Sequence, residues 1–340
     1  MSSADVRFGL TLPNRGVITG ATTTEDMFAL AKKADETQAW DSIWVGDSIF
    51  AKPRLDALVL LGSLAAITRR VKLGPACFAS TPLRNALLLA YQWASLDYIS
   101  NGRTIFVACQ GAPGSGGGQF KEEFAAFQVD PASRMRRMEE AIEVLRLTSS
   151  HENVTYRGQY NQFDDVTVLP RPVQHPIPIW VTANPDDWDP RKPDPVKLQR
   201  ADRALRRVAK YGDGWMTTLN TPDSFSSHLG MIRKFAIEEG RDLGPEFEAC
   251  LYYNINVSEN RDAAMSESKR FLDSYYGVDY PRSTLERWVA CGSPRQCIES
   301  LNHFIRAGAT TITLRLTGYD QRRQFDRVTA EVLPALVEKK

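Results

Sequence analysis

The segment of residues 96–111 reads LDYISNGRTIFVACQG, and its second half decides the fold. Residues 104–109 form a short, almost continuously apolar run, which is typical of a strand buried on both faces. Seven other runs have the same character, at residues 6–12, 42–46, 71–78, 177–182, 214–218, 249–257 and 310–316. Helical patterns separate them. Strands alternating with helices predict a parallel α/β fold, either an open sheet or a closed barrel.

The helical segments have recognisable ends. Thr24 is placed to cap a helix, and Pro131 follows Asp130 at the first position of another. Ser293 and Gln296 have the spacing of a capping box, and Gly308 is placed to end the helix that they begin.

The position of the glycine-rich stretch favours a barrel over an open sheet. No GxGxxG follows the first strand, where a dinucleotide-binding sheet carries it. Residues 111–118 are rich in glycine but follow the fourth strand, and residues 184–195 are dense in Pro and Asp. Both segments are interpreted as loops at the C-terminal ends of the strands. We therefore predict one (β/α)8 TIM barrel over residues 1–340, with insertion loops at the C-terminal mouth.

The composition is that of a soluble protein with small-molecule chemistry. The 42 basic and 41 acidic residues nearly cancel, which argues against a nucleic-acid or membrane-surface binder. No apolar run is long enough for a membrane helix, and the first residues lack the pattern of a signal peptide. We expect a cytoplasmic protein. The five cysteines are scattered, so neither a disulfide framework nor a zinc site is predicted.

In a barrel, the site is built at the C-terminal ends of the strands. The residues at those positions are mostly uncharged and form hydrogen bonds; among them are Asp47, Ser48, Ser80, Cys109, Gln110, Gly111, Thr182, Ala183 and Asn184. Asp47 is the candidate acid or base, although a strand-end Asp is nearly as often a helix cap. No Ser/His/Asp set is visible. Such a site suits an organic cofactor that brings its own reactivity.

Four fragments carry a family resemblance. TPLR at 81–84 with LDYISNGR at 96–103, YRGQY at 156–160 with PRPVQHPIPIW at 170–180, DGW at 213–215 and GSP at 292–294 occur in order along the chain. Together they resemble the bacterial-luciferase-like oxidoreductases. The resemblance implies a (β/α)8 barrel that binds reduced FMN or a reduced deazaflavin, an oligomer (we expect a homodimer), and, in the FMN branch, a separate NAD(P)H:flavin reductase.

The resemblance also implies roles for particular residues. Gln110 stands where the family has an arginine facing the flavin phosphate, and Ala183 with Asn184 matches a pair that touches the same phosphate. Ser80 lies near a non-proline cis peptide beside the flavin ring. Gly111, Thr182 and the Trp215 of DGW complete the expected cofactor contacts.

The main departure is at the second strand. Many members have a histidine where this chain has Ser48, so Asp47, Ser48 and Cys109 become the candidate catalytic residues. Serine is not an acid or base near neutral pH, which leaves that part to Asp47. Cys109 is either a small residue that lets the flavin lie close to the strand or a thiol that tunes it.

Four functions follow as hypotheses. The first is an FMN-dependent monooxygenase that uses oxygen on a small organic substrate, and the second is a deazaflavin-dependent dehydrogenase or reductase. The third is a luciferase-like subunit that binds flavin, or only a partner chain, without turnover, suggested by Ser48 and Gln110. A flavin-free barrel lyase or isomerase is the fourth, although no lysine or carboxylate pair lies at the strand ends.

Overall fold

The computed structural model describes residues 6–111, 118–185 and 195–337, and the chain divides into two compact units. The first unit comprises residues 1–11, 180–274 and 279–340, and the second comprises residues 12–179 and 275–278. Most of the glycine-rich stretch, residues 112–117, and most of the predicted insertion, residues 186–194, lie outside the described residues.

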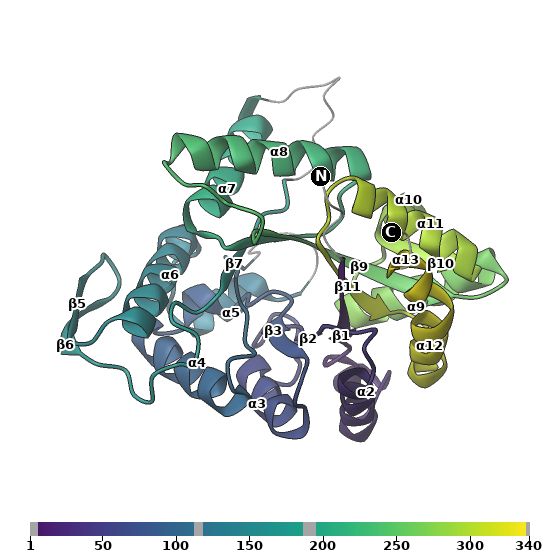
Figure 1. Cartoon of the computed structure of the whole chain (residues 1–340), viewed down its shortest axis with the longest axis horizontal. Coiled ribbons are helices and arrows are strands. Elements are labelled where there is room, and N and C mark those ends of the chain that lie inside the picture. Colours follow the sequence, from purple (N-terminus) through teal and green to yellow (C-terminus); the bar gives the residue numbers. More distant parts are fainter. Residues whose placement is uncertain (1–5, 112–117, 186–194, 338–340) are drawn as a thin grey trace. The chain divides into compact units, whose positions relative to one another are not determined.

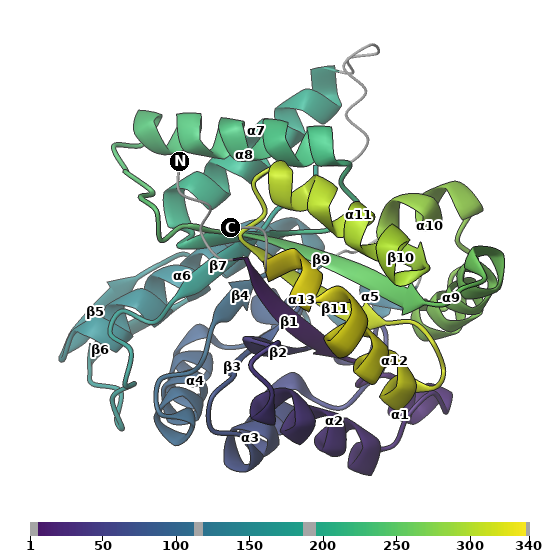
Figure 2. The same ribbon diagram turned by 45° about the vertical axis from the view of Figure 1, so that its right-hand side comes forward.

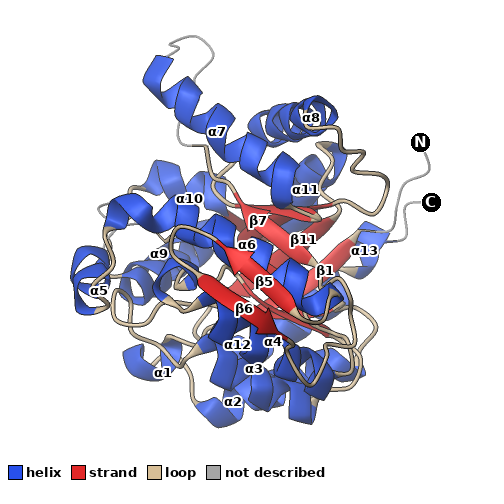
Figure 3. Ribbon diagram, turned by 90° about the vertical axis from the view of Figure 1, so that its left-hand side faces the viewer, coloured by secondary structure: helices blue, strands red, loops and turns tan. Residues whose placement is uncertain are grey.

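The second unit is an α/β unit with an added hairpin (Figure 1). Its elements are α1 (Gly16–Thr19), α2 (Thr24–Glu36), β2 (Ser42–Val45), α3 (Ala57–Ile67), β3 (Lys72–Pro75), η1 (Thr81–Leu83), α4 (Ala86–Ser100), β4 (Phe106–Ala108), α5 (Phe120–Ala126), η2 (Pro131–Ser133), α6 (Arg134–Ser150), β5 (Val154–Arg157) and β6 (Gln162–Val166). β2 pairs with β3 in parallel, and isolated parallel bridges join the chain around β3 to that around β4. The β5–β6 hairpin is antiparallel and lies beside α6 (Figure 3).

An aromatic cluster fixes α4 against the strands of this unit. Trp93 on α4 and Phe106 on β4 meet edge to face with ring centroids 4.8 Å apart, and Phe78 contacts both rings. Asn85 caps α4 by accepting the Leu88 N–H. These ring contacts pack α4 against β4 and against the segment after β3.

The sequence motif at residues 96–103 has a structural role, because its side chains form buried hydrogen bonds between neighbouring elements. The carboxylate of Asp97, on α4, is fully buried and accepts hydrogen bonds from the Thr104 hydroxyl (2.6 Å) and from the backbone N–H (2.9 Å) and side-chain amide (2.7 Å) of Gln174. The Arg103 guanidinium donates to backbone carbonyls of Ala65 and Val71, among others. These contacts join α4, the start of β4 and the proline-rich segment that follows β6.

The first unit carries five parallel strands in the order β1-β11-β9-β8-β7, and β10 pairs with β9. Its elements are β1 (Arg7–Leu12), β7 (Ile179–Thr182), α7 (Pro195–Tyr211), β8 (Gly214–Thr217), α8 (Pro222–Glu238), β9 (Glu248–Val257), α9 (Arg261–Tyr276), α10 (Arg282–Trp288), β10 (Val289–Gly292), α11 (Pro294–Arg306), β11 (Thr311–Leu316), α12 (Gln321–Arg327), the π-helical turn η3 (Val328–Val332) and α13 (Pro334–Val337). Figure 2 shows α11 and α12 lying over β9 and β11.

The eight predicted strands are all found; seven are shorter than predicted at one or both ends, and β9 begins one residue earlier. The capping box of Ser293 and Gln296 is confirmed, whereas the cap of α2 is Thr23 and not Thr24. Pro131 opens a 3-10 turn that precedes α6. The β5–β6 hairpin and β10 were not predicted. The order of elements along the chain is that of a (β/α)8 barrel, and no described helix is long and apolar enough to cross a membrane.

Candidate functional site

Asp47 is a buried carboxyl immediately after β2. Its Oδ2 accepts the backbone N–H of Ser80 at 2.7 Å, and its Oδ1 lies 4.0 Å from Nη2 of Arg84. Burial raises the pKa of Asp47 above the usual value for aspartate, and Arg84 and the Ser80 hydrogen bonds only partly oppose this. A carboxyl in this environment keeps its proton to a higher pH than an exposed one. It is therefore a candidate general acid or base at a higher pH than an exposed aspartate would be.

Arg84 organises the surroundings of that carboxyl. Its Nε donates to the Ser80 hydroxyl at 2.8 Å, its Nη2 donates to Asp56 at 2.7 Å, and its guanidinium stacks over the Phe78 ring. Ser80 is fully buried. The Ser80 N–H donates to Asp47 and the Ser80 hydroxyl accepts from Arg84, so Ser80 helps to hold the carboxyl, and its contact with a cofactor stays a prediction.

A face of small side chains lies beside Asp47. After β3, Ala76, Cys77 and Ala79 are partly exposed, and Cys109 after β4 is partly exposed as well. Cys77 and Cys109 contact each other, and the hydrogen bond between the thiols and burial raise the pKa of Cys77 well above its usual value. The peptide bond between Ala76 and Cys77 is cis, three residues before the Ser80 neighbourhood where we expected one.

Gly111 and Gln110 extend this face beyond β4. Gly111 is buried with a φ of +68°, and a Cβ there would lie 3.1 Å from the carbonyl oxygen of Ala79. Glycine is required for this close approach of two backbones. Gln110 is partly exposed. Small side chains and open backbone groups beside a proton-holding carboxyl fit a flat ring laid against the strand ends, so these residues fit a flavin or a deazaflavin.

Ser48 has a local structural role. It is buried, and its Oγ accepts the backbone N–H of Lys52 at 2.9 Å, which closes a turn after β2. The next turn is held by Glu123, whose Oε2 accepts the N–H groups of Ile49 (2.9 Å), Phe50 (2.5 Å) and Ala51 (2.8 Å). The Ser48 hydroxyl thus fixes the turn that follows Asp47. This structural role is consistent with the hypothesis that Asp47, and not Ser48, transfers the proton.

In the first unit, the predicted residues after β7 are tied to β8. Asn184 accepts, through Oδ1, the Thr217 hydroxyl at 3.0 Å and the Thr218 N–H at 2.9 Å. The indole N–H of Trp215 donates to the Ala183 carbonyl at 2.9 Å. Trp215 is fully buried and its ring packs against Phe225 of α8. The Trp215 side chain therefore holds the Ala183 carbonyl in place through this hydrogen bond. Thr182 remains partly exposed at the strand end.

A second group in the same unit includes Trp288, a residue that was not predicted. The Thr218 hydroxyl donates to the Tyr252 carbonyl at 3.0 Å and accepts the Trp288 indole N–H at 2.7 Å. Arg315 is almost completely buried, with its guanidinium over the Tyr252 ring. Thr218, Tyr252 and Arg315 lie in the predicted strands 214–218, 249–257 and 310–316, whereas Trp288 lies on α10, outside every predicted strand.

His228, on α8, is buried. Its protonation makes the free energy of unfolding depend on pH. Its Nδ1 lies 3.0 Å from Asn220 Oδ1, and burial lowers its pKa to about 4. The unfolded chain, with a pKa near 6.5, binds the proton more readily. The contribution is therefore complete above pH about 6.5 and is lost as the pH falls toward 4.

We expect the free energy of unfolding to drop by about 2–3 kcal/mol across that window because of this group. His228→Gln is expected to flatten the drop, as measured by urea unfolding at a series of pH values. His151→Gln, at an exposed position, is the matched control and should leave the pH dependence unchanged. An equal drop in the His228→Gln variant would contradict this assignment.

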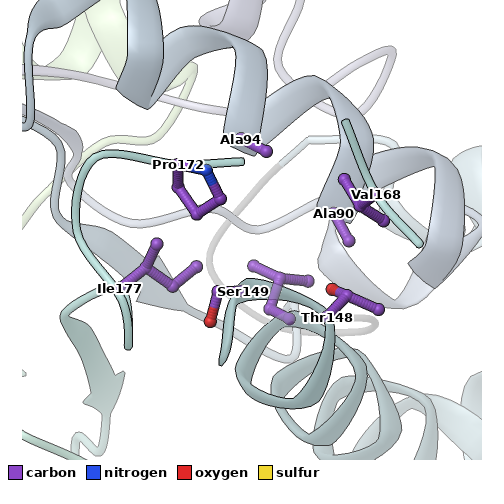
Figure 4. Close-up of a pocket in the computed structure, with 8 residues that line it drawn as sticks. Ala90, Ala94, Thr148, Ser149, Val168, Pro172 and Ile177 are labelled. Atoms are coloured by element: carbon purple, nitrogen blue, oxygen red, sulfur yellow. The ribbon is translucent and has the colours of Figure 1, made fainter. Parts of the chain in front are cut away.

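A small recess elsewhere in the second unit offers no chemistry (Figure 4). It lies between α4 and α6 and is lined by Ala90, Ala94, Leu145, Thr148, Ser149, Val168, Pro172 and Ile177. Its two hydroxyls, on Thr148 and Ser149, donate to carbonyls of their own helix. We regard it as a packing gap.

The strand–helix order and the polar strand ends define the class: a (β/α)8-barrel protein with a candidate site at the carboxyl ends of its strands. A solved F420-dependent secondary alcohol dehydrogenase, in complex with an F420–acetone adduct, is similar with a TM-score of 0.77 and 17% identity, over 98% of this chain and 99% of that one. The monooxygenase RslO1 from Streptomyces bottropensis is similar with a TM-score of 0.76 and 23% identity, over 97% and 99%. Both likenesses confirm the predicted fold.

Sequence comparison gives the family. The model of the luciferase-like monooxygenases matches residues 6–311, so the chain belongs to this family, as the motifs predicted. A curated relative, the F420-dependent glucose-6-phosphate dehydrogenase of Kineococcus radiotolerans, is 27% identical over 93% of this chain and 96% of its own length.

Proposed function

We propose that this protein is an F420-dependent oxidoreductase, a dehydrogenase or reductase that moves a hydride between the deazaflavin and a small organic substrate. The observation that carries the proposal is its likeness, over nearly the full length of both chains, to a relative named for F420. The solved alcohol dehydrogenase named for the same cofactor is similar in fold. The comparisons do not support our first expectation, reduced FMN with oxygen, and favour the deazaflavin alternative.

The site residues suit this chemistry. Bound F420 supplies a ring carbon that accepts or donates a hydride. Ala76, Cys77, Ala79 and Cys109 present small side chains on which the ring can lie.

Asp47 provides the proton step. When the substrate is an alcohol, a hydride leaves its carbon while Asp47 Oδ1 takes the hydroxyl proton; in the reverse direction Oδ1 returns it. Arg84 and the Ser80 N–H hold the carboxyl in one orientation through both directions. Because burial raises the pKa of Asp47, the proton is shared more evenly near neutral pH than it would be on an exposed aspartate.

Oxygen consumption tests the type of reaction. The purified chain is mixed with reduced F420 and, separately, with reduced FMN in the presence of oxygen and a panel of small alcohols and carbonyl compounds. We expect carbonyl reduction with F420 and no oxygen uptake above that of the free cofactor. Substrate-dependent oxygen uptake with FMN would contradict the proposal and restore the monooxygenase hypothesis. A homodimer and a separate flavin reductase remain predictions, the second only for an FMN enzyme.

A further inference from the structure

The outer faces of α3 and α4 carry no charged side chain. The two helices lie side by side in the second unit (Figure 2). α3 reads ALVLLGSLAAI, without a charged residue, and the single charged residue of α4, Asp97, is fully buried. The neighbouring helices α2 and α6 differ, because each presents several lysine, arginine or glutamate side chains at its surface. A surface helix normally turns a polar face to water, so α3 and α4 depart from this rule together.

Large apolar side chains project from this face. They are Val59 on α3 and Leu88, Tyr91, Tyr98 and Ile99 on α4, which are 71%, 54%, 50%, 59% and 62% exposed. Those of α4, together with Ser95, follow the three- and four-residue steps that mark one side of a helix. The five large side chains expose roughly 500 Å² of mostly apolar surface. Apolar patches of this size mark interaction sites on soluble proteins.

The outer face of α3 is lined mainly by small residues. After Val59, the same three- and four-residue steps lead to Gly62, Ser63 and Ala66, which are all exposed or partly exposed. A Cβ on Gly62 would meet no atom within 4 Å. The Ser63 hydroxyl donates to the Val59 carbonyl of its own helix at 3.0 Å. α3 therefore leaves room for large side chains of a partner to approach its backbone closely.

Large side chains on one helix beside small ones on the next make this face complementary to a second copy of itself. Both helices follow parallel strands, β2 and β3, and therefore run in the same direction. A two-fold axis along the helices, between α3 and α4, sets α4 of each copy against α3 of the other. The helices start at the same level, since Asp56, the cap of α3, pairs at 2.7 Å with Arg84, which precedes the cap of α4. Gly62 and Tyr91 are equally far from those caps, so the axis brings Tyr91 of one copy onto Gly62 of the other.

Charge and area both favour a second copy as the partner. Because the face is uncharged, two copies meet without repulsion and without removing an ionic group from water. A charged protein surface finds no complementary charge on this face, and an anionic membrane finds no lysine or arginine. The partly exposed Leu58, Leu87 and Gln92 extend the patch toward the about 800 Å² that each partner contributes to a standard interface.

We propose that the chain forms a homodimer through α3 and α4, with α4 of each copy packed on α3 of the other. This inference goes beyond the proposed function and does not depend on it. The dimer has a consequence for the candidate site, because both helices begin beside the pair of Asp56 and Arg84. Arg84 also donates to Ser80, whose N–H holds Asp47. Packing at the interface therefore stabilises the helix ends next to the carboxyl.

Sedimentation velocity of the full chain over a range of concentrations tests the association. We expect a species of twice the 38.1 kDa mass of one chain. Gly62→Arg places a long charged side chain on the face without a clash inside the monomer, and arginine favours a helix more than glycine does. This variant is expected to keep the wild-type circular dichroism spectrum and to weaken dimerisation at least about tenfold. Gly230→Arg on α8, where a Cβ also meets nothing within 4 Å, is the matched control and should dimerise as the wild type does.

Tyr91→Glu tests which helices face each other. Alone, this variant is expected to weaken the dimer as Gly62→Arg does, because it removes a carboxylate from water at the interface. In a mixture of the two variants, the new carboxylate of one chain meets the new guanidinium of the other, while the second half of the interface is native. We expect the mixture to associate at least about tenfold more tightly than either variant alone. A purely structural effect of either substitution would not produce this rescue.

Three results would overturn the proposal. A wild-type chain that stays monomeric at every concentration would assign the apolar face to a different partner. A dimer that survives both substitutions would show that two copies associate through another surface. If each variant is monomeric and their mixture is monomeric as well, α4 of one copy does not pack on α3 of the other. None of these measurements uses the cofactor, so a failure of the proposed function leaves their outcome unchanged.

Discussion

Asp47→Asn is expected to lower kcat of hydride transfer by about 10²–10⁴-fold, the usual contribution of one general acid or base. Asparagine has nearly the same shape and can still accept the Ser80 N–H, so the loss reports the missing proton transfer. Binding of F420, followed by fluorescence, should be unchanged. Asp223→Asn, on α8, is the control carboxylate and should retain full activity.

The pH profile gives the same carboxyl a second signature. Burial raises the pKa of Asp47, so substrate oxidation, which needs the ionised form, is expected to fall as the pH drops through that raised pKa. Substrate reduction needs the protonated form and should fall as the pH rises through it. Asp47→Asn should lose both dependences. An Asp47→Asn enzyme within a few-fold of wild-type kcat would remove Asp47 from the proton step.

Asp97→Ala is expected to lower the free energy of unfolding by about 3–5 kcal/mol, because it leaves several buried donors without an acceptor. The fully buried Thr104 hydroxyl and the backbone N–H of the half-buried Gln174 lose their acceptor, and the Gln174 side-chain amide keeps only the Thr104 carbonyl. Urea unfolding measures the loss. Ser95→Ala on the same helix removes an exposed hydroxyl that bonds its own helix, and should change stability by less than about 0.5 kcal/mol. Equal effects in the two variants would contradict the fastening role.

The fold could be predicted because its signals are local. Each strand is a short apolar run, and capping groups such as Ser293 mark helix starts. Where prediction failed, the signal was weak: β6 reads QFDDV, with alternating and mostly exposed side chains, and β10 is only VACG. Short segments of this kind become strands through their partners, β5 and β9, which no local pattern identifies.

The motifs that revealed the family lie mostly outside the candidate site. Asp97 and Arg103 fasten α4, and Gly158 makes room for the buried carboxylate of Glu140. Asp47 was found from its place at a strand end. Arg84 was recognised as part of a family motif. Its hydrogen bonds to Ser80 and Asp56 could not be predicted, because they form only in the folded chain.

The central claim is the choice of deazaflavin over FMN, and an anaerobic equilibrium titration tests it most directly. The purified chain is titrated with F420 and, in parallel, with FMN, each in its oxidised and reduced form, and binding is followed by fluorescence. We predict saturable F420 binding at least about tenfold tighter than that of FMN, a difference of about 1.4 kcal/mol or more. Tighter binding of reduced FMN than of either form of F420 would contradict the account.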